Sequence, residues 1–195
     1  MTTYFSVDLE YTGPCPPQYQ VLSIGCAAYN EHGEELSTFH KGIHYQILQW
    51  DYRTLEFWTE QGQTFKDLLV NSWISLDPER VWPMFSDWVQ YINQSDDTPV
   101  LIADPIAADW PWIVHGFTSV GIDNPFRYKG LCLNSYIRAK LRLDLWAKVR
   151  DLYPSEHAHD ALADARAQGK TYFRFRDASV EELEEMRRQL TSNDS

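Results

Sequence analysis

The run Tyr4-Phe5-Ser6-Val7-Asp8-Leu9-Glu10 has the apolar and aromatic character of a buried β-strand, yet it carries two carboxylates two positions apart. Because side chains alternate between the two faces of a strand, Asp8 and Glu10 should project from one face while the apolar residues pack on the other. Two adjacent negative charges repel each other, so this arrangement favours a shared cation or a raised pKa. The alternative is a strand end with both carboxylates in water, which is the commoner outcome for an isolated pair. Other parts of the chain must decide between them.

Length and composition predict one globular domain. The 195 residues are 44% hydrophobic, enough for one well-filled core, and we expect residues 1–190 to form a single domain with a disordered tail over 191–195. We see no signal peptide and no apolar stretch long enough to span a membrane. The three cysteines, Cys15, Cys26 and Cys132, are widely spaced without a C-x-x-C pair, which indicates reduced thiols in a cytoplasmic protein.

The net charge of −11 argues against an electrostatic grip on long duplex nucleic acid. It does not exclude an enzyme that acts on nucleic acid, because metal ions can cancel charge within a site. Residues 138–150 contain five basic side chains, which form either a local basic surface or a solvated helix face.

The order of the predicted elements indicates an α/β protein. Five segments have strand character: 4–9, 20–29, 35–44, 100–103 and 128–133. Seven segments have helical character: 54–60, 65–69, 79–93, 109–120, a helix capped by Asn134 or Ser135 and continuing to about Asp151, 160–175 and 180–190. A meander followed by alternating helices and strands predicts a central mixed five-stranded sheet with helices on both faces.

A second polar cluster lies near the C-terminus. His159 precedes an alanine-rich helical run that contains Asp164, and the small neighbours of Asp164 allow another backbone to approach closely. A spacing of five does not place two residues on one helix face, so His159 should act from the preceding loop. Asp109 follows the strand at 100–103 and opens a helix, where the dipole favours a carboxylate. Four carboxylates and one histidine are thus candidates for a common site.

In their order and context, these residues resemble the DEDDh branch of the DnaQ-like 3′-to-5′ exonucleases, which includes RNase T and oligoribonuclease. Asp8-Leu9-Glu10-Tyr11-Thr12-Gly13 is similar to the first motif of that family, and Ala107-Ala108-Asp109-Trp110-Pro111-Trp112-Ile113 occupies the place of the second. His159 to Asp164 has the H-x-x-x-x-D form of the third. The resemblance implies an RNase H-like fold of the small single-domain exoribonuclease type.

Some positions depart from the family pattern or leave alternatives. The second motif often has Asn and Phe where this chain has Asp104 and Ala108, so Asp104 is the alternative to Asp109. Position 160 is Asp and not the tyrosine of the sister DEDDy branch, and we expect it to cap a helix. His157 is an alternative base with a poorer spacing, and a zinc site made by His157 and His159 is a minor alternative.

The resemblance also implies roles for the site residues. Asp8, Glu10, Asp109 and Asp164 would hold two Mg²⁺ or Mn²⁺ ions, with Asp8 as the bridge and Asp109 binding mainly through water. His159 would take the proton from the attacking water. We expect the substrate to be contacted by Tyr11, Thr12 and Trp58, with stacking on the terminal bases by the two aromatic rings. Core or lid packing is the alternative for Trp58.

The implied function is metal-dependent 3′-5′ exonuclease activity on the 3′ end of single-stranded RNA or DNA, with RNA slightly favoured. One alternative is a nucleic-acid-binding or scaffold module that has lost activity on the same fold. Another is an endonuclease on a related fold, for which the histidine spacing is wrong. Members of the family often form homodimers, and the many aromatic residues would suit an apolar interface.

Overall fold

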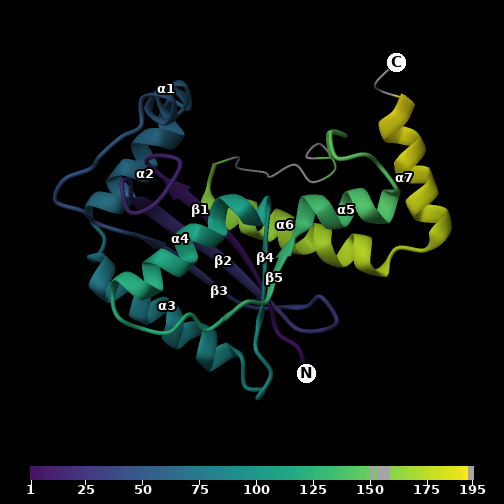
Figure 1. Cartoon of the computed structure of the whole chain (residues 1–195), viewed down its shortest axis with the longest axis horizontal. Helices are drawn as coiled ribbons and strands as arrows, with labels where there is room; N and C mark the ends of the chain where they lie inside the picture. The colour runs from purple at the N-terminus through teal and green to yellow at the C-terminus, as the bar shows by residue number, and fades with distance from the viewer. Residues whose placement is uncertain (150–151, 153–158, 193–195) are drawn as a thin grey trace.

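A mixed five-stranded sheet forms the centre of the protein in a computed structural model that describes residues 1–149, 152 and 159–192 (Figure 1). Its strands are β1 (Tyr4–Tyr11), β2 (Val21–Tyr29), β3 (Glu35–Gly42), β4 (Val100–Ala103) and β5 (Gly130–Cys132), in the order β3-β2-β1-β4-β5. The first three strands pair antiparallel, whereas β4 runs parallel to β1 and β5 runs parallel to β4. The predicted meander and the mixed sheet are both confirmed.

Helices cover both faces of this sheet. They are α1 (Tyr52–Glu60), α2 (Gln63–Trp73), α3 (Pro78–Ile92), α4 (Ile106–Ser119), α5 (Leu133–Leu141), α6 (Ala161–Asp177) and α7 (Val180–Ser192). In Figure 1, α1 and α2 lie on one side of the molecule and α7 lies on the opposite side. Within the described part of the chain, no helix is long and apolar enough to cross a membrane.

The strand β1 separates two environments, as its alternating sequence predicts. Its apolar side chains belong to a core shared with aromatic residues of α3 and α4, including Phe85 and Phe117. Its opposite face carries Asp8 and Glu10 and packs against α6. The strand therefore supplies core packing on one side and carboxylates on the other.

The close approach of α6 to the sheet depends on Gly25. This residue pairs with Asp8 across the β1–β2 ladder, so it points toward the same face. A Cβ atom on Gly25 would lie 2.1 Å from the backbone carbonyl carbon of Ala161, at the start of α6. The absence of a side chain at this position allows the first turn of α6 to lie directly on the strand.

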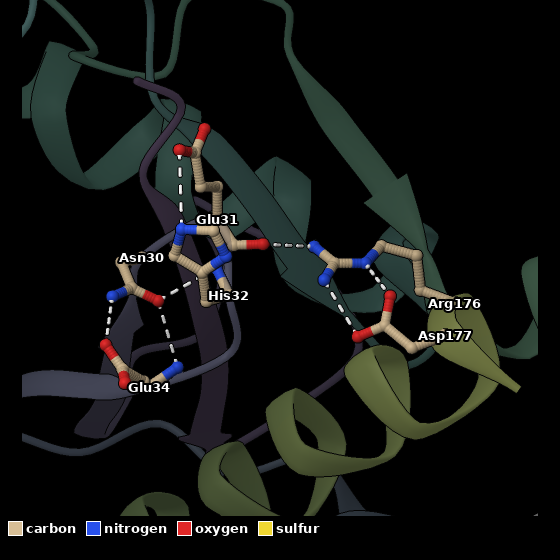
Figure 2. A network of polar contacts seen from close by, with 6 residues as sticks. All are labelled: Asn30, Glu31, His32, Glu34, Arg176 and Asp177. Carbon is tan, nitrogen blue, oxygen red and sulfur yellow. Dashed lines mark hydrogen bonds and ion pairs between the residues drawn. The ribbon is translucent and has the colours of Figure 1, made fainter.

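The far end of α6 is fastened to the β2–β3 turn by the polar contacts in Figure 2. The guanidinium of Arg176 donates to the carbonyl oxygen of Glu31 at 2.8 Å and pairs with Asp177 at 2.6 Å. The Asn30 carboxamide oxygen accepts the backbone N–H groups of His32 and Glu34, which fixes the turn. Both ends of α6 are thus held against the sheet.

The predicted length of α5 is wrong. It ends at Leu141 and not near Asp151, because Arg142 adopts a left-handed conformation with φ 51°. The N–H of Leu143 then donates to the carbonyl oxygen of Arg138, which closes the helix end. Beyond it, Asp144 accepts the N–H groups of Trp146 and Ala147 in a turn.

Two basic residues of this region make local hydrogen bonds. Arg138 donates to the carbonyl oxygen of Ala147, and the Lys140 ammonium donates to that of Arg176. The last helix, α7, includes Thr191 and Ser192, which we expected in the tail, while residues 193–195 lie outside the described part.

Candidate active site

Three carboxylates converge where β1 meets the first turn of α6. One oxygen from each of Asp8, Glu10 and Asp164 lies within 4.8 Å of the other two. The exposed fractions of Glu10 and Asp164 are only 8% and 4%. Hard carboxylate oxygens gathered at such distances are the ligands that Mg²⁺ and Mn²⁺ prefer.

The charges around Glu10 also favour a bound cation. Burial raises the pKa of Glu10 well above its ordinary value, and the charges of Asp8, Asp164, Asp109 and Asp160 raise it further. These four neighbours are all carboxylates, so each disfavours a negative charge on Glu10. A divalent ion between the oxygens would reverse this effect and allow Glu10 to ionise.

His159 lies beside the carboxylates in the loop that precedes α6. Its backbone N–H donates to the Asp164 carboxylate at 2.8 Å, and its own φ of 67° is unusual for a residue other than glycine. The next residue, Asp160, caps α6 by accepting the N–H of Ala163 at 2.8 Å, as we predicted. The five-residue spacing of His159 and Asp164 therefore reflects a loop folded back onto its own helix. His157 lies outside the described residues.

Asp109 and Asp104 reach the cleft from α4 and from the end of β4. Asp109 is buried in the first turn of α4, and Asp104 is buried just after β4. Both line the cleft, but neither belongs to the group of three carboxylates that lie within 4.8 Å of one another. Asp109 acts on the charge of Glu10, which places it within electrostatic reach of the cluster.

The cleft that joins these groups has a volume of about 470 Å³. Besides the carboxylates and His159, it is lined by Leu9, Tyr11, Arg53, Thr54, Phe57, Trp58, Pro105 and Ala108. Its walls are largely apolar and its floor is acidic. A second cavity of about 340 Å³ reaches Glu10 and His159 from the side of α2.

The aromatic residues of the cleft differ in exposure. Tyr11 stacks on Trp112 at 5.2 Å, just after a shift of register in the β1–β2 pairing. Trp58 is only 1% exposed, and its indole N–H donates to the carbonyl oxygen of Tyr11. Phe57 is 41% exposed and meets the His159 ring edge-on at 4.9 Å. The ring most open to a ligand is therefore that of Phe57, which sequence reasoning missed although it adjoins Trp58.

Thr12 does not line this cleft. Its side chain is fully buried, and its hydroxyl accepts the N–H of Gln20 at 2.9 Å. Sequence reasoning also missed Arg53 and Thr54, which enter the cleft from α1, and Gln168 of α6, whose amide donates to Asp8. Only the position of α1 relative to the sheet could have indicated the first two.

Comparison with known families agrees with this geometry. The family model described as the 3′-5′ exoribonuclease Rv2179c-like domain matches residues 3–174. The chain belongs to this family. Membership in the Rv2179c-like family supports 3′-5′ exonuclease activity.

Individual relatives of this Rv2179c-like protein are described as nucleases. It is 29% identical over 175 residues to the 3′-5′ DNA exonuclease Cap18 of Escherichia coli, covering 87% of this chain and 89% of Cap18. The nuclease domain of 3′hExo, a DEDDh family member solved with bound rAMP, aligns with a TM-score of 0.68 at 14% identity, over 88% of this chain and 90% of that domain.

Cell-death related nuclease 4 (CRN-4) gives a TM-score of 0.67 at 15% identity and covers 91% of this chain. The Rv2179c-like chain spans 64% of the length of that protein. At such identities the structural similarity shows the fold, and it confirms the predicted RNase H-like fold of the DEDDh exonucleases.

Proposed function

We propose that this protein removes nucleotides from the 3′ end of single-stranded RNA, with divalent cations bound by Asp8, Glu10 and Asp164 and with Asp109 as an outer ligand. The observation that carries this proposal is the convergence of three carboxylates within 4.8 Å in a cleft that also contains His159. Two Mg²⁺ or Mn²⁺ ions held there would stabilise the attacking and leaving oxygens of an in-line displacement.

His159 is the general base in this proposal. A water oxygen attacks the phosphorus of the terminal phosphodiester, one of its protons passes to the His159 imidazole, and the bond from phosphorus to the 3′ oxygen breaks, with that oxygen taking a proton from solvent water. The products are a nucleoside 5′-monophosphate and a strand shortened by one residue. The hydrogen bond from the backbone N–H of His159 to Asp164 supports this role, because it holds the histidine beside a proposed metal ligand.

The walls of the cleft suit a terminal nucleotide. Phe57 and Tyr11 offer aromatic surface for the base, and Arg53 offers a guanidinium to the phosphate backbone. Trp58 supports this wall from behind, since it is buried against Phe65 and His159. We place Thr12 in the support of the turn that carries Tyr11.

Single-stranded DNA is the second candidate substrate, because Cap18 is described as a DNA exonuclease and aligns over most of both chains. RNA is preferred here because the family model is described as an exoribonuclease domain. We also place the activity in the cytoplasm, since Cys15, Cys26 and Cys132 are free thiols.

The test uses 5′-labelled RNA and DNA single strands of matched sequence, incubated with Mg²⁺ or Mn²⁺. A ladder that shortens from the 3′ end supports an exonuclease, and the ratio of kcat/KM for the two strands identifies the preferred substrate. Internal cuts would indicate an endonuclease, and binding without cleavage would indicate a binding module. Asp164→Asn, which removes the charge of one metal ligand, is the inactive control.

A further inference from the structure

A buried amide of α6 contacts the metal-binding face of β1. The Nε2 atom of Gln168 donates to Oδ1 of Asp8 at 2.7 Å. Gln168 lies one helical turn beyond Asp164 on α6, and it is 2% exposed. One helix therefore presents a carboxylate and an amide to the same patch of β1.

This amide is poorly suited to plain core packing. The other terminal atom of Gln168, Oε1, is buried and accepts no hydrogen bond within the part of the chain that the structure describes. An unsatisfied buried acceptor destabilises the folded state, whereas an apolar side chain of similar length would fill the space without that cost. A gain elsewhere must account for the amide.

The advantage of an amide at this position comes from the negative charge of the three carboxylates. Asp8 lies within 4.8 Å of two other carboxylates, and their mutual repulsion favours rotation of its side chain away from them. A neutral N–H donor can hold one oxygen of Asp8 without cancelling the negative charge that a cation needs. A lysine or arginine at this position would hold Asp8 equally well but would compete with the cation.

We propose that Gln168 is a positioning residue, which fixes the Asp8 carboxylate in the orientation required for binding of a divalent cation. This inference rests on the proposed metal-dependent function, but it concerns cation binding and can be tested without turnover. Outer residues that orient metal ligands typically contribute a factor of about 10–100 in metal affinity.

The experiment measures Mn²⁺ binding by isothermal titration calorimetry on metal-free protein. Gln168→Met should bind Mn²⁺ about 10-fold or more weakly than the wild type. Its thermal midpoint without metal should lie close to that of the wild type, because removal of the unsatisfied acceptor offsets the loss of the hydrogen bond to Asp8. Thr171→Val is the matched control, since it replaces another buried polar group of α6 and should leave Mn²⁺ affinity unchanged.

A double-mutant cycle separates positioning from a general structural effect. If Gln168 acts through Asp8, adding Gln168→Met to Asp8→Ala should cause no further loss of Mn²⁺ affinity. Unchanged Mn²⁺ affinity in the single variant, or an equal loss in both backgrounds, would overturn the proposal and leave the exonuclease function as it stands. Wild-type protein that binds Mn²⁺ but degrades no strand would overturn the proposed function without affecting the role of Gln168.

Discussion

Glu10 is buried among carboxylate neighbours, so a bound cation should change its pKa strongly. Besides burial, its pKa is raised by Asp8, Asp164 and Asp109, the residues that would share metal ions with it. At the residue scale, the acid–base behaviour of this site therefore reports directly on metal binding.

The raised pKa predicts a pH-dependent stability for the metal-free protein. A folded-state pKa above the unfolded value means that the folded state binds more protons, so the contribution of Glu10 is full below about pH 4.5 and is lost as pH rises through the folded pKa. In EDTA, the free energy of unfolding of Glu10→Gln should rise relative to that of the wild type over this window. The difference is at most about 1.4 kcal/mol per pH unit.

Chemical denaturation at several pH values measures this difference. Saturating Mn²⁺ should reverse it, because the bound cation allows Glu10 to ionise and stabilises the wild type more than a variant that lacks one ligand. Parallel stability curves for the two proteins in EDTA would show that the burial of Glu10 carries no electrostatic penalty.

His159 should contribute to turnover and not to binding. His159→Ala is expected to lower kcat by about 10²–10⁴-fold, the usual contribution of a general base, with little change in the affinity for Mn²⁺ or for a short oligonucleotide. His159→Asn is the matched variant, because asparagine tolerates the left-handed backbone of this position better than alanine. An equal loss of binding in both variants would remove His159 from the role of base.

Patterns in the sequence could identify the site residues whose positions follow from neighbouring residues along the chain. Strand alternation determines that Asp8 and Glu10 share a face, and the spacing of His159 and Asp164 follows from a loop that folds onto its own helix cap. Phe57 and Gln168 could not be found in this way. Which of two adjacent aromatic residues faces the cleft, and which side of α6 meets Asp8, depends on how the helices dock.

At the scale of elements, the docking of α6 on β2 sets the distance between the two halves of the carboxylate cluster. The contact of Gly25 with Ala161 is closer than any side chain would permit. The alanine-rich run predicts a close approach of another backbone, and the structure identifies Gly25 as the partner. The end of α5 could not be predicted from the sequence, because Arg142 takes the left-handed position that glycine usually occupies.

Gly25→Ala should therefore damage the site from a distance. The new methyl group would force the start of α6 away from β2, which should destabilise the fold by about 1–3 kcal/mol. The same shift moves Asp164 away from Asp8 and Glu10, so Mn²⁺ affinity should fall as well. Denaturation and calorimetry on one protein preparation would measure both effects.

Gly130→Ala provides the control for this variant. There the atoms nearest to the new methyl group belong to the side chains of Ile106 and Trp110 and not to the backbone, and the terminal atom of Ile106, the nearest, can rotate away. Its Mn²⁺ affinity should equal that of the wild type. Unchanged Mn²⁺ affinity in Gly25→Ala would show that α6 can move without disturbing the cluster.

At the scale of the whole molecule, an acidic protein must bind a polyanion. The net charge is −11, and Arg53 is the sole arginine or lysine among the described residues that line the cleft. Binding must then depend on aromatic contacts and bound cations more than on many phosphate contacts.

The affinity for a single-stranded oligonucleotide should accordingly depend weakly on salt. One phosphate contact predicts a slope of about −0.7 in a plot of log K against log monovalent salt. This slope is measured by fluorescence anisotropy at constant Mg²⁺ with Asp164→Asn, which prevents turnover. Arg53→Ala should bring the slope near zero, and a slope several times steeper would indicate a basic surface outside the cleft.

The hydrogen bond from the His159 N–H to Asp164 has a consequence for thermodynamic linkage. The same carboxylate would bind a cation and hold the loop, so the two events share a free energy of coupling. Linkage is reciprocal: if a bound cation changes the population of the docked loop by some factor, docking of the loop changes the cation affinity by that same factor. A strand that changes how often the His159 N–H contacts Asp164 would then change the cation affinity of the site by that same factor.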